Sequence, residues 1–249
     1  MNKDERSILF IFAHPDDETF TCAGTACRYA TEGVRLALVS ATRGEPGTCG
    51  QPPICSREEL PAVREGELRH AAEIIGIGEL YFLDYKDKEL ADAPVEEVRR
   101  ALVRIIRQVR PTIVITFDPE GLNLHPDHIA ISRFTSDAVA AAADPRWFPE
   151  AADAHEVERL LWTTPKRLDE VAALDNPDRE AGVDYILNVS RWRQAKADAL
   201  RAHRTQQESI NKIFFEIPNS EAVLSLEVYR QAWNPRSKRL PFGDLFAEL

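Results

Sequence analysis

Two short stretches of the sequence concentrate side chains that bind metals and transfer protons. The first, AHPDDE at residues 13–18, brings one imidazole and three carboxylates together. The second, HPDH at residues 125–128, follows over a hundred residues later and supplies two imidazoles and a carboxylate. Unpaired charges are costly to bury, so the first cluster either reaches solvent or is held together by a cation.

The spacing allows the two stretches to share one metal ion. His14 and Asp17 are three residues apart on one turn, and His125 and His128 share a face if they begin a helix. Two imidazoles and a carboxylate are a zinc ligand set that leaves the fourth position open for water. Zinc is the expected metal, although Fe2+ or another divalent ion accepts the same ligands. Asp16 would remain beside the metal as the general base.

Each stretch follows a predicted buried strand. Apolar runs at residues 8–12 and 113–117 precede them, and both stretches lead toward helical patterns. Parallel strands place such loops at one edge of a sheet, where ligands bind in open α/β folds. Strands alternate with helices through the first half of the chain. This order predicts a Rossmann-like α/β fold, with a mostly parallel sheet, helices on both faces and the active site at the carboxyl ends of the strands.

The remaining elements are predicted from periodicity and turn residues. We expect one domain over residues 1–249, with a core at about 7–145, while residues 146–249 extend the sheet and cap the site. A long loop is expected over 42–61, and its residues 49–54 are expected to form a mobile lip over the site, with a flexible surface excursion as the alternative. The arginines of the helix at 94–109, among them Arg107, are expected on its solvated face. Further predictions are helices over 19–33, 60–75, 192–207 and 221–233, strands over 34–40, 80–83, 160–164 and 185–189, and a loop over 169–184.

Bulk properties exclude several classes of protein. The net charge of −10 argues against a nucleic-acid partner, which requires a basic face. No segment approaches 18 uninterrupted apolar residues, so we expect no stable membrane insertion. The four cysteines are expected to be free thiols of a cytoplasmic protein, with a Cys49–Cys55 disulfide as the alternative. A homo-oligomer is compatible with these data.

AHPDDE after the first strand, with a later HPDH, resembles the LmbE-like (PIG-L) family of zinc-dependent de-N-acetylases. The resemblance spans roughly residues 7–210 and includes Arg43, Arg64 and the series Lys196, His203 and Gln206. It implies a metal-dependent hydrolase that removes the N-acetyl group from a small-molecule N-acetylglucosamine-type sugar conjugate, with zinc-activated water as the nucleophile. It also implies that His128 is the third ligand and that His125 faces the substrate.

These assignments give the remaining groups their expected roles. A protonated His125 would stabilise the oxyanion that forms when water attacks the amide. Asp127 would orient and charge His125, cap the following helix, or do both. The leaving amine would take its proton from Asp16 or His125, and the residues leave both open. Glu18 is expected to be a first-turn acid that is favourable to the helix dipole.

Four residues are candidates for binding the substrate: Arg43, Arg64, Asp84 and His203. The alternative for Arg64 is a surface ion pair with Glu67, and the alternative for Asp84 is a turn. A histidine on a polar helix, such as His203, is often only solvated.

The chain also departs from the family pattern. Asn123 lies two residues before His125, where mycothiol-type deacetylases carry a tyrosine implicated in acid chemistry. This weakens a mycothiol assignment and places more of the proton donation on Asp16 and His125. Alternative functions are an amidase acting on another amide, such as a thiol S-conjugate, and a non-catalytic sugar or metal binder. A nucleotide-binding module is disfavoured because no Gly-x-Gly-x-x-Gly loop follows the first strand.

Overall fold

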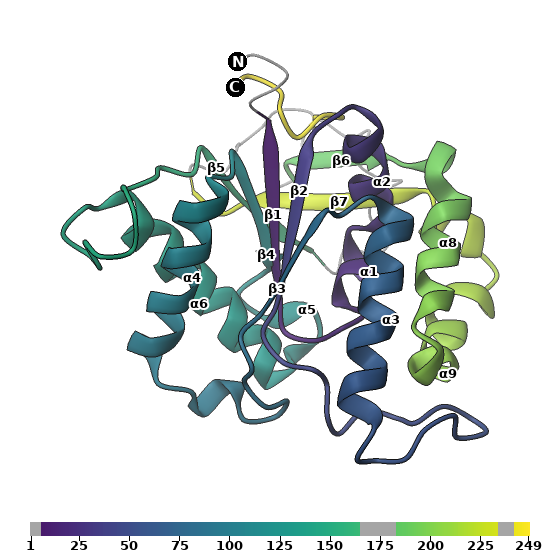
Figure 1. Ribbon diagram of the computed structural model, residues 1–249. Coiled ribbons are helices and arrows are strands. Elements are labelled where there is room, and N and C mark those ends of the chain that lie inside the picture. The colour runs from purple at the N-terminus through teal and green to yellow at the C-terminus, as the bar shows by residue number, and fades with distance from the viewer. Residues whose placement is uncertain (1–5, 165–182, 234–241) are drawn as a thin grey trace.

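The computed structural model of the protein describes residues 6–164, 183–233 and 242–249. In these residues the chain forms a seven-stranded sheet with the order β3-β2-β1-β4-β5-β7-β6 (Figure 1). Strands β3, β2, β1, β4 and β5 are parallel, and β7 runs antiparallel to β5 and β6. The predicted mostly parallel α/β sheet is therefore confirmed. The strands are β1 (Ser7–Phe12), β2 (Arg35–Ser40), β3 (Glu79–Phe82), β4 (Ile113–Phe117), β5 (Arg159–Thr163), β6 (Tyr185–Asn188) and β7 (Leu226–Gln231).

Helices cover both faces of the sheet (Figure 1). On one face α4 packs against α6, and on the other α2, α3 and α8 pack together. Strands β1 and β4 are buried along their whole length because both of their faces are covered. The longer helices are α2 (Ala23–Thr31), α3 (Leu60–Ile75), α4 (Val95–Val109), α6 (Pro126–Ala143) and α8 (Arg193–Ala202). The shorter ones are α1 (Asp17–Thr21), α5 (Gly121–Leu124), α9 (Gln207–Ile210) and α10 (Ser220–Val223).

The helix predicted over residues 19–33 is interrupted. Helix α1 ends at Thr21, and α2 begins two residues later at Ala23. The backbone N–H groups of Gly24 and Thr25 donate to the carboxylate of Glu227, at 2.9 and 2.7 Å. A residue distant in sequence therefore caps a second helix at this point, which local periodicity cannot reveal.

The prediction of a helix over residues 221–233 is wrong. Helix α10 ends at Val223, and residues Leu226–Gln231 form strand β7. Inward-facing positions of β7 alternate, and two of them are Glu227 and Tyr229, which are both buried. The sequence does not show the alternation of apolar and polar residues that is typical of a strand, because one buried position holds the polar Glu227. Its charge is paired with Lys196 at 2.7 Å.

Arg107 also differs from its prediction. Its guanidinium is buried instead of solvated, and its nitrogens donate to five backbone carbonyls at and beyond the end of α6. The helix predicted over 192–207 is shorter than expected, because α8 ends at Ala202 and a 3-10 turn follows. The loop predicted over 169–184 lies mostly outside the described residues.

Beyond residue 145, β5, β6 and β7 add to the sheet. The end of the chain packs onto α2, where the Tyr29 hydroxyl donates to Asp244 at 2.8 Å and the Tyr29 ring contacts Phe246. None of the helices in the described part of the chain combines the length and the apolar character needed to span a bilayer.

Candidate metal centre and active site

The two polar stretches meet because their strands are neighbours. β1 and β4 pair in parallel, with Ile8 opposite Ile113, so the loops that follow them leave the same edge of the sheet (Figure 1). His14, Asp17 and His128 come together at this edge, and all three are buried. Nδ1 of His14 lies 3.2 Å from Nε2 of His128. The Asp17 carboxylate lies 3.3 Å from His128 Nε2 and 3.6 Å from His14 Nδ1.

Hydrogen bonds on the outer nitrogens orient both imidazoles. His128 Nδ1 lies 3.1 Å from the Gly121 carbonyl, which can only accept a hydrogen bond, so this nitrogen carries the proton. His14 Nε2 likewise faces carboxylates, with Asp127 Oδ2 at 3.3 Å and Asp87 Oδ1 at 3.2 Å. In the neutral rings the lone pairs of His14 Nδ1 and His128 Nε2 therefore point at each other beside Asp17. Asp17 Oδ2 also accepts from the backbone N–H groups of Ala13 and His14, which fix the carboxylate in this position. Three acceptors that converge in this way fit a cation.

The local backbone supports this orientation of His128. Gly121 has a φ of 65°, and a Cβ added to it would lie 2.8 Å from the His128 Cβ and 2.7 Å from the Ile129 nitrogen. A larger residue would displace the carbonyl that accepts from His128.

The charges around the site favour a positive species. Burial lowers the pKa of His14, but the carboxylates of Asp127, Asp87 and Asp17 outweigh burial and raise it to about 10. Burial raises the pKa of Asp17, but His128 and His14 outweigh burial and lower it to about 2. A proton or a metal ion is thus attracted to the point where these groups meet. The donor set is compatible with zinc and with other divalent ions.

Two groups join this cluster beyond the three expected ligands. Asp87 was missed by the sequence analysis, although it lies in the polar segment after β3, at the same edge of the sheet. The ring of His125 is also close enough that one of its nitrogens could join His14 and His128 around an ion.

Asp16 lies beside the cluster and is paired with Arg64. Its Oδ2 accepts a hydrogen bond from the Arg64 guanidinium at 3.0 Å, and Arg64 also donates to the carbonyls of Pro15 and Gly44. Burial raises the pKa of Asp16 to about 6, against the opposing effect of Arg64. Glu67, which was considered as the partner of Arg64, instead accepts from the backbone and the hydroxyl of Thr205.

His125 is less buried than the other two imidazoles, and it precedes α6. Its Nδ1 accepts a hydrogen bond from the Asp127 backbone N–H at 3.2 Å, so a neutral ring carries its proton on Nε2. Burial and the imidazoles of His14 and His128 lower the pKa of His125. This favours a neutral ring over the expected imidazolium. The Asp127 carboxylate faces His14 and accepts from the Lys88 N–H at 2.6 Å, so it orients His14 rather than His125.

The remaining predicted substrate-binding residues, Arg43, Asp84 and His203, lie outside the cluster of His14, Asp17 and His128. Arg43 pairs with Asp84 and, at 2.7 Å, with Glu65. Asp84 is exposed, and the two residues follow β2 and β3 at the carboxyl edge of the sheet. His203 is fully buried, and its Nε2 lies 2.8 Å from Glu18 Oε1. Glu18 is itself buried, unlike a first-turn acid that only complements a helix dipole.

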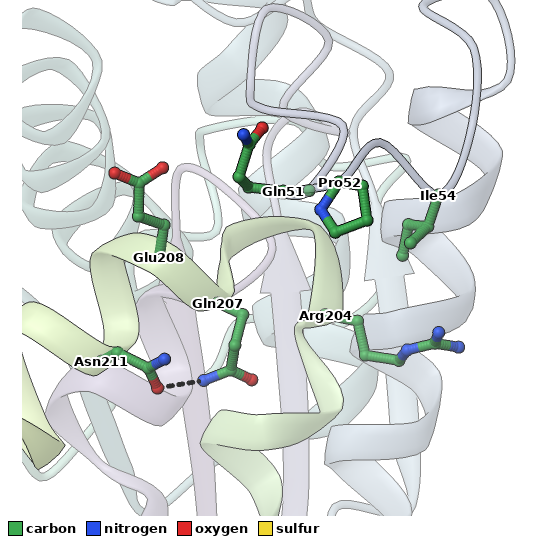
Figure 2. Close-up of a pocket in the computed structure, with 8 residues that line it drawn as sticks. Gln51, Pro52, Ile54, Arg204, Gln207, Glu208 and Asn211 are labelled. Carbon is green, nitrogen blue, oxygen red and sulfur yellow. Dashed lines mark hydrogen bonds between the residues drawn. The ribbon is translucent and has the colours of Figure 1, made fainter.

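A pocket of about 440 Å³ lies between the loop after β2 and the segment that follows α8 (Figure 2). Gln51, Pro52 and Ile54 form one wall, so the predicted lip packs against the chain after His203. Figure 2 shows Gln207 and Asn211 hydrogen-bonded to each other on the other wall, at 2.8 Å. None of the polar side chains that line this pocket is buried.

Fold and site together define an α/β protein with a candidate metal centre at the carboxyl edge of a mostly parallel sheet. The family model described as "PIG-L: GlcNAc-PI de-N-acetylase" matches residues 9–139, which is more than half of the 249-residue chain. The chain therefore belongs to the PIG-L family, as its motifs predicted.

Individual relatives agree with this membership. The chain is 37% identical over 206 residues to a probable N-acetyl-alpha-D-glucosaminyl L-malate deacetylase 2 of Bacillus anthracis, covering 82% of this chain and 83% of the relative. It is 31% identical to a 1D-myo-inositol 2-acetamido-2-deoxy-alpha-D-glucopyranoside deacetylase of Geodermatophilus obscurus, covering 98% of both chains. The N,N'-diacetylchitobiose deacetylase from Pyrococcus horikoshii matches in structure with a TM-score of 0.71 and 24% identity, covering 91% of this chain and 83% of that one. At that identity the match concerns the fold alone.

Proposed function

We propose that this chain is a metal-dependent hydrolase that removes the N-acetyl group from an N-acetylglucosamine-type sugar conjugate and gives acetate and a free amine. The observation that carries the proposal is the convergence of three acceptors, from His14, Asp17 and His128, beside the Asp16 carboxylate. The names of the sequence relatives support the reaction and the class of substrate.

His14, Asp17 and His128 would hold the metal, which we propose to be zinc. When bound, such an ion acts as a Lewis acid that polarises a carbonyl group and makes water easier to deprotonate. Asp127, and Asp87 with it, would keep His14 in the tautomer that the site needs, because both carboxylates face its Nε2.

Asp16 is proposed to take the proton from the attacking water. A general base works best when its pKa lies near the working pH, and burial moves the pKa of Asp16 in this direction. The guanidinium of Arg64 fixes the carboxylate, which gives Arg64 a positioning role instead of the predicted contact with substrate. The protonated Asp16 would then pass its proton to the leaving amine. His125 is the alternative donor only if it is first protonated, which its lowered pKa disfavours.

His125 is proposed to donate its Nε2–H to the developing oxyanion. The Asp127 N–H occupies its Nδ1, so the donor is set by the backbone at the start of α6. A neutral imidazole can stabilise an oxyanion through a hydrogen bond without first taking up a proton.

Arg43 and Asp84 are proposed to bind sugar hydroxyls at the carboxyl edge of the sheet. They are paired with each other, and Asp84 exposes 72% of its side chain. A substrate hydroxyl could replace one half of this exposed ion pair at little cost, because such pairs contribute about 0–1 kcal/mol.

Acetate release from a panel of N-acetylglucosaminides tests this proposal. The panel holds the free sugar and its inositol, malate and chitobiose forms, each assayed with metal-stripped protein and after zinc is restored. We expect zinc-dependent release from one conjugate and none from Asp16→Asn. If protein with stoichiometric zinc releases acetate from no member, the proposed reaction is wrong. An amidase for a thiol S-conjugate has the same residues, so such a conjugate belongs in the panel.

A further inference from the structure

Asp16 has an unusual backbone conformation. Its φ is 110° and its ψ is −29°, in the left-handed region that non-glycine residues avoid. Such a residue is strained and persists only where its surroundings enforce it. Because the backbone sets the direction of the side chain, these surroundings also decide where the carboxylate points.

The enforcing contact comes from Glu18, two residues later. Its Oε2 accepts a hydrogen bond from the Asp16 backbone N–H at 3.1 Å. Asp16 is the N-cap residue of α1, and its own side chain makes no capping hydrogen bond. The Glu18 carboxylate, in the first turn, folds back onto the N-cap N–H instead. Glu18 is 1% exposed and cannot exchange this contact for water.

The second oxygen of Glu18 is held by His203. The imidazole Nε2 lies 2.8 Å from Glu18 Oε1, and since a carboxylate accepts, Nε2 carries the proton. His203 has no exposed surface, and its Nδ1 has no hydrogen-bond partner in the described part of the chain. Buried polar atoms are normally paired. The imidazole therefore tolerates an unpaired nitrogen while it makes one contact, to Glu18.

We propose that Glu18 and His203 form a positioning pair that holds the backbone of Asp16 in its working conformation; the proposal rests on Asp16 being the base. The pair fixes the base from the backbone side, while Arg64 fixes the carboxylate. Neither residue reaches the reacting atoms. The pair also connects the end of α8 to the first turn of α1, just after β1, so a segment from the second half of the chain sets the geometry of the first motif.

Kinetics of four variants test the pair: Glu18→Ala, His203→Leu, their combination and His203→Gln. A small misplacement of a catalytic group lowers the rate by up to about 100-fold. We therefore expect Glu18→Ala and His203→Leu each to lower kcat by about 10- to 100-fold and to change KM by less than about twofold. The combined variant should lose no more than the worse single one. Glutamine retains an N–H near Glu18, so His203→Gln should recover most of the rate.

Exchange of the Asp16 amide hydrogen tests the same contact without activity. In metal-loaded protein we expect a protected Asp16 amide that exchanges at least about tenfold faster in Glu18→Ala and His203→Leu. The Ile11 amide in β1 and the variant His70→Leu, at an exposed histidine, are the controls.

Three results would contradict the proposed positioning role: an unchanged exchange rate of the Asp16 amide, losses of kcat that multiply in the combined variant, or a rise in KM alone. If no conjugate is turned over by the natural sequence but Asp16 exchange responds as expected, the contact is retained and the proposed reaction fails.

Discussion

The two ring nitrogens of His14 face different groups. Nδ1 faces His128 and Asp17, whereas Nε2 faces Asp127 and Asp87. The motif predicts His14 as a ligand, but only the carboxylates on its outer side determine which nitrogen is available. The same division between an inner ligand atom and an outer hydrogen bond holds for His128 and the Gly121 carbonyl.

Asp16→Asn and His128→Ala should separate catalysis from metal binding. Asparagine leaves the three ligands in place but cannot take a proton, so we expect stoichiometric zinc and at least about a 100-fold loss of kcat. His128→Ala should lose both, because it removes a ligand. Metal analysis and acetate release check the pair of outcomes. Normal turnover by zinc-loaded Asp16→Asn would contradict its role as the base.

Arg107 determines how two elements meet. It lies in α4, and its buried guanidinium binds the carbonyls at the end of α6 and in the loop beyond. The carbonyls that end a helix need partners, and here they find them in the neighbouring helix. Because α6 carries Asp127 and His128 at its other end, Arg107 stabilises the helix without touching the site.

Arg107→Met should destabilise the protein by about 2–4 kcal/mol, because it leaves buried carbonyls unpaired. Urea unfolding of metal-loaded protein measures the loss. Arg104→Met is the control on the same helix; Arg104 is exposed, and its replacement should change stability by less than about 0.5 kcal/mol. A loss of similar size in both variants would show that the carbonyl contacts are unimportant.

His155 gives the connection between α6 and β5 a dependence on pH. Its Nε2 donates to the Pro111 carbonyl at 2.8 Å, and burial lowers its pKa in the folded protein. The unfolded chain, with a pKa of about 6.5, then binds more protons below that pH. The contribution of His155 is therefore present above pH ~6.5 and is lost as the pH falls.

His155→Gln keeps a donor for the Pro111 carbonyl but does not titrate. The stability of the natural sequence relative to this variant should therefore increase between about pH 5 and pH 7 and level off above it. Urea unfolding at several pH values gives the difference. A difference that is independent of pH, or that increases as the pH falls, would contradict the lowered pKa.

At the scale of the fold, the proposed metal site would connect the loops that follow the two neighbouring central strands β1 and β4. The proposed ligands lie just after β1 and in the first turn of α6, so a bound ion would join segments that are over a hundred residues apart. An ion that binds the folded chain and not the unfolded one stabilises the fold by mass action.

Removing the metal should therefore lower the melting temperature. At a free zinc concentration of about 100 times Kd, the stabilisation is about 2.7 kcal/mol. We expect a chelator to lower Tm, added zinc to restore it, and His128→Ala to abolish the response. Scanning calorimetry of the three states checks this. An unchanged Tm after complete removal of the metal would argue against a site that bridges the two loops.

Local patterns in the sequence predict the parallel core and the polar clusters correctly. Buried strands such as 8–12 are continuous apolar runs, and each cluster lies within a few residues of such a run, so both signals are local. The long loop before α3 and the helix at 95–109 were also predicted, because prolines, glycines and helical spacing are local features too.

Contacts between residues that are distant in sequence became visible only in the tertiary structure. Glu18 meets His203 across 185 positions, and Glu227 caps α2 across about two hundred. Local periodicity records which side of an element is apolar, but not which buried polar group finds a partner. This is why the sequence predicts a helix where β7 lies, a solvated Arg107, and His125 instead of His14 as the partner of Asp127.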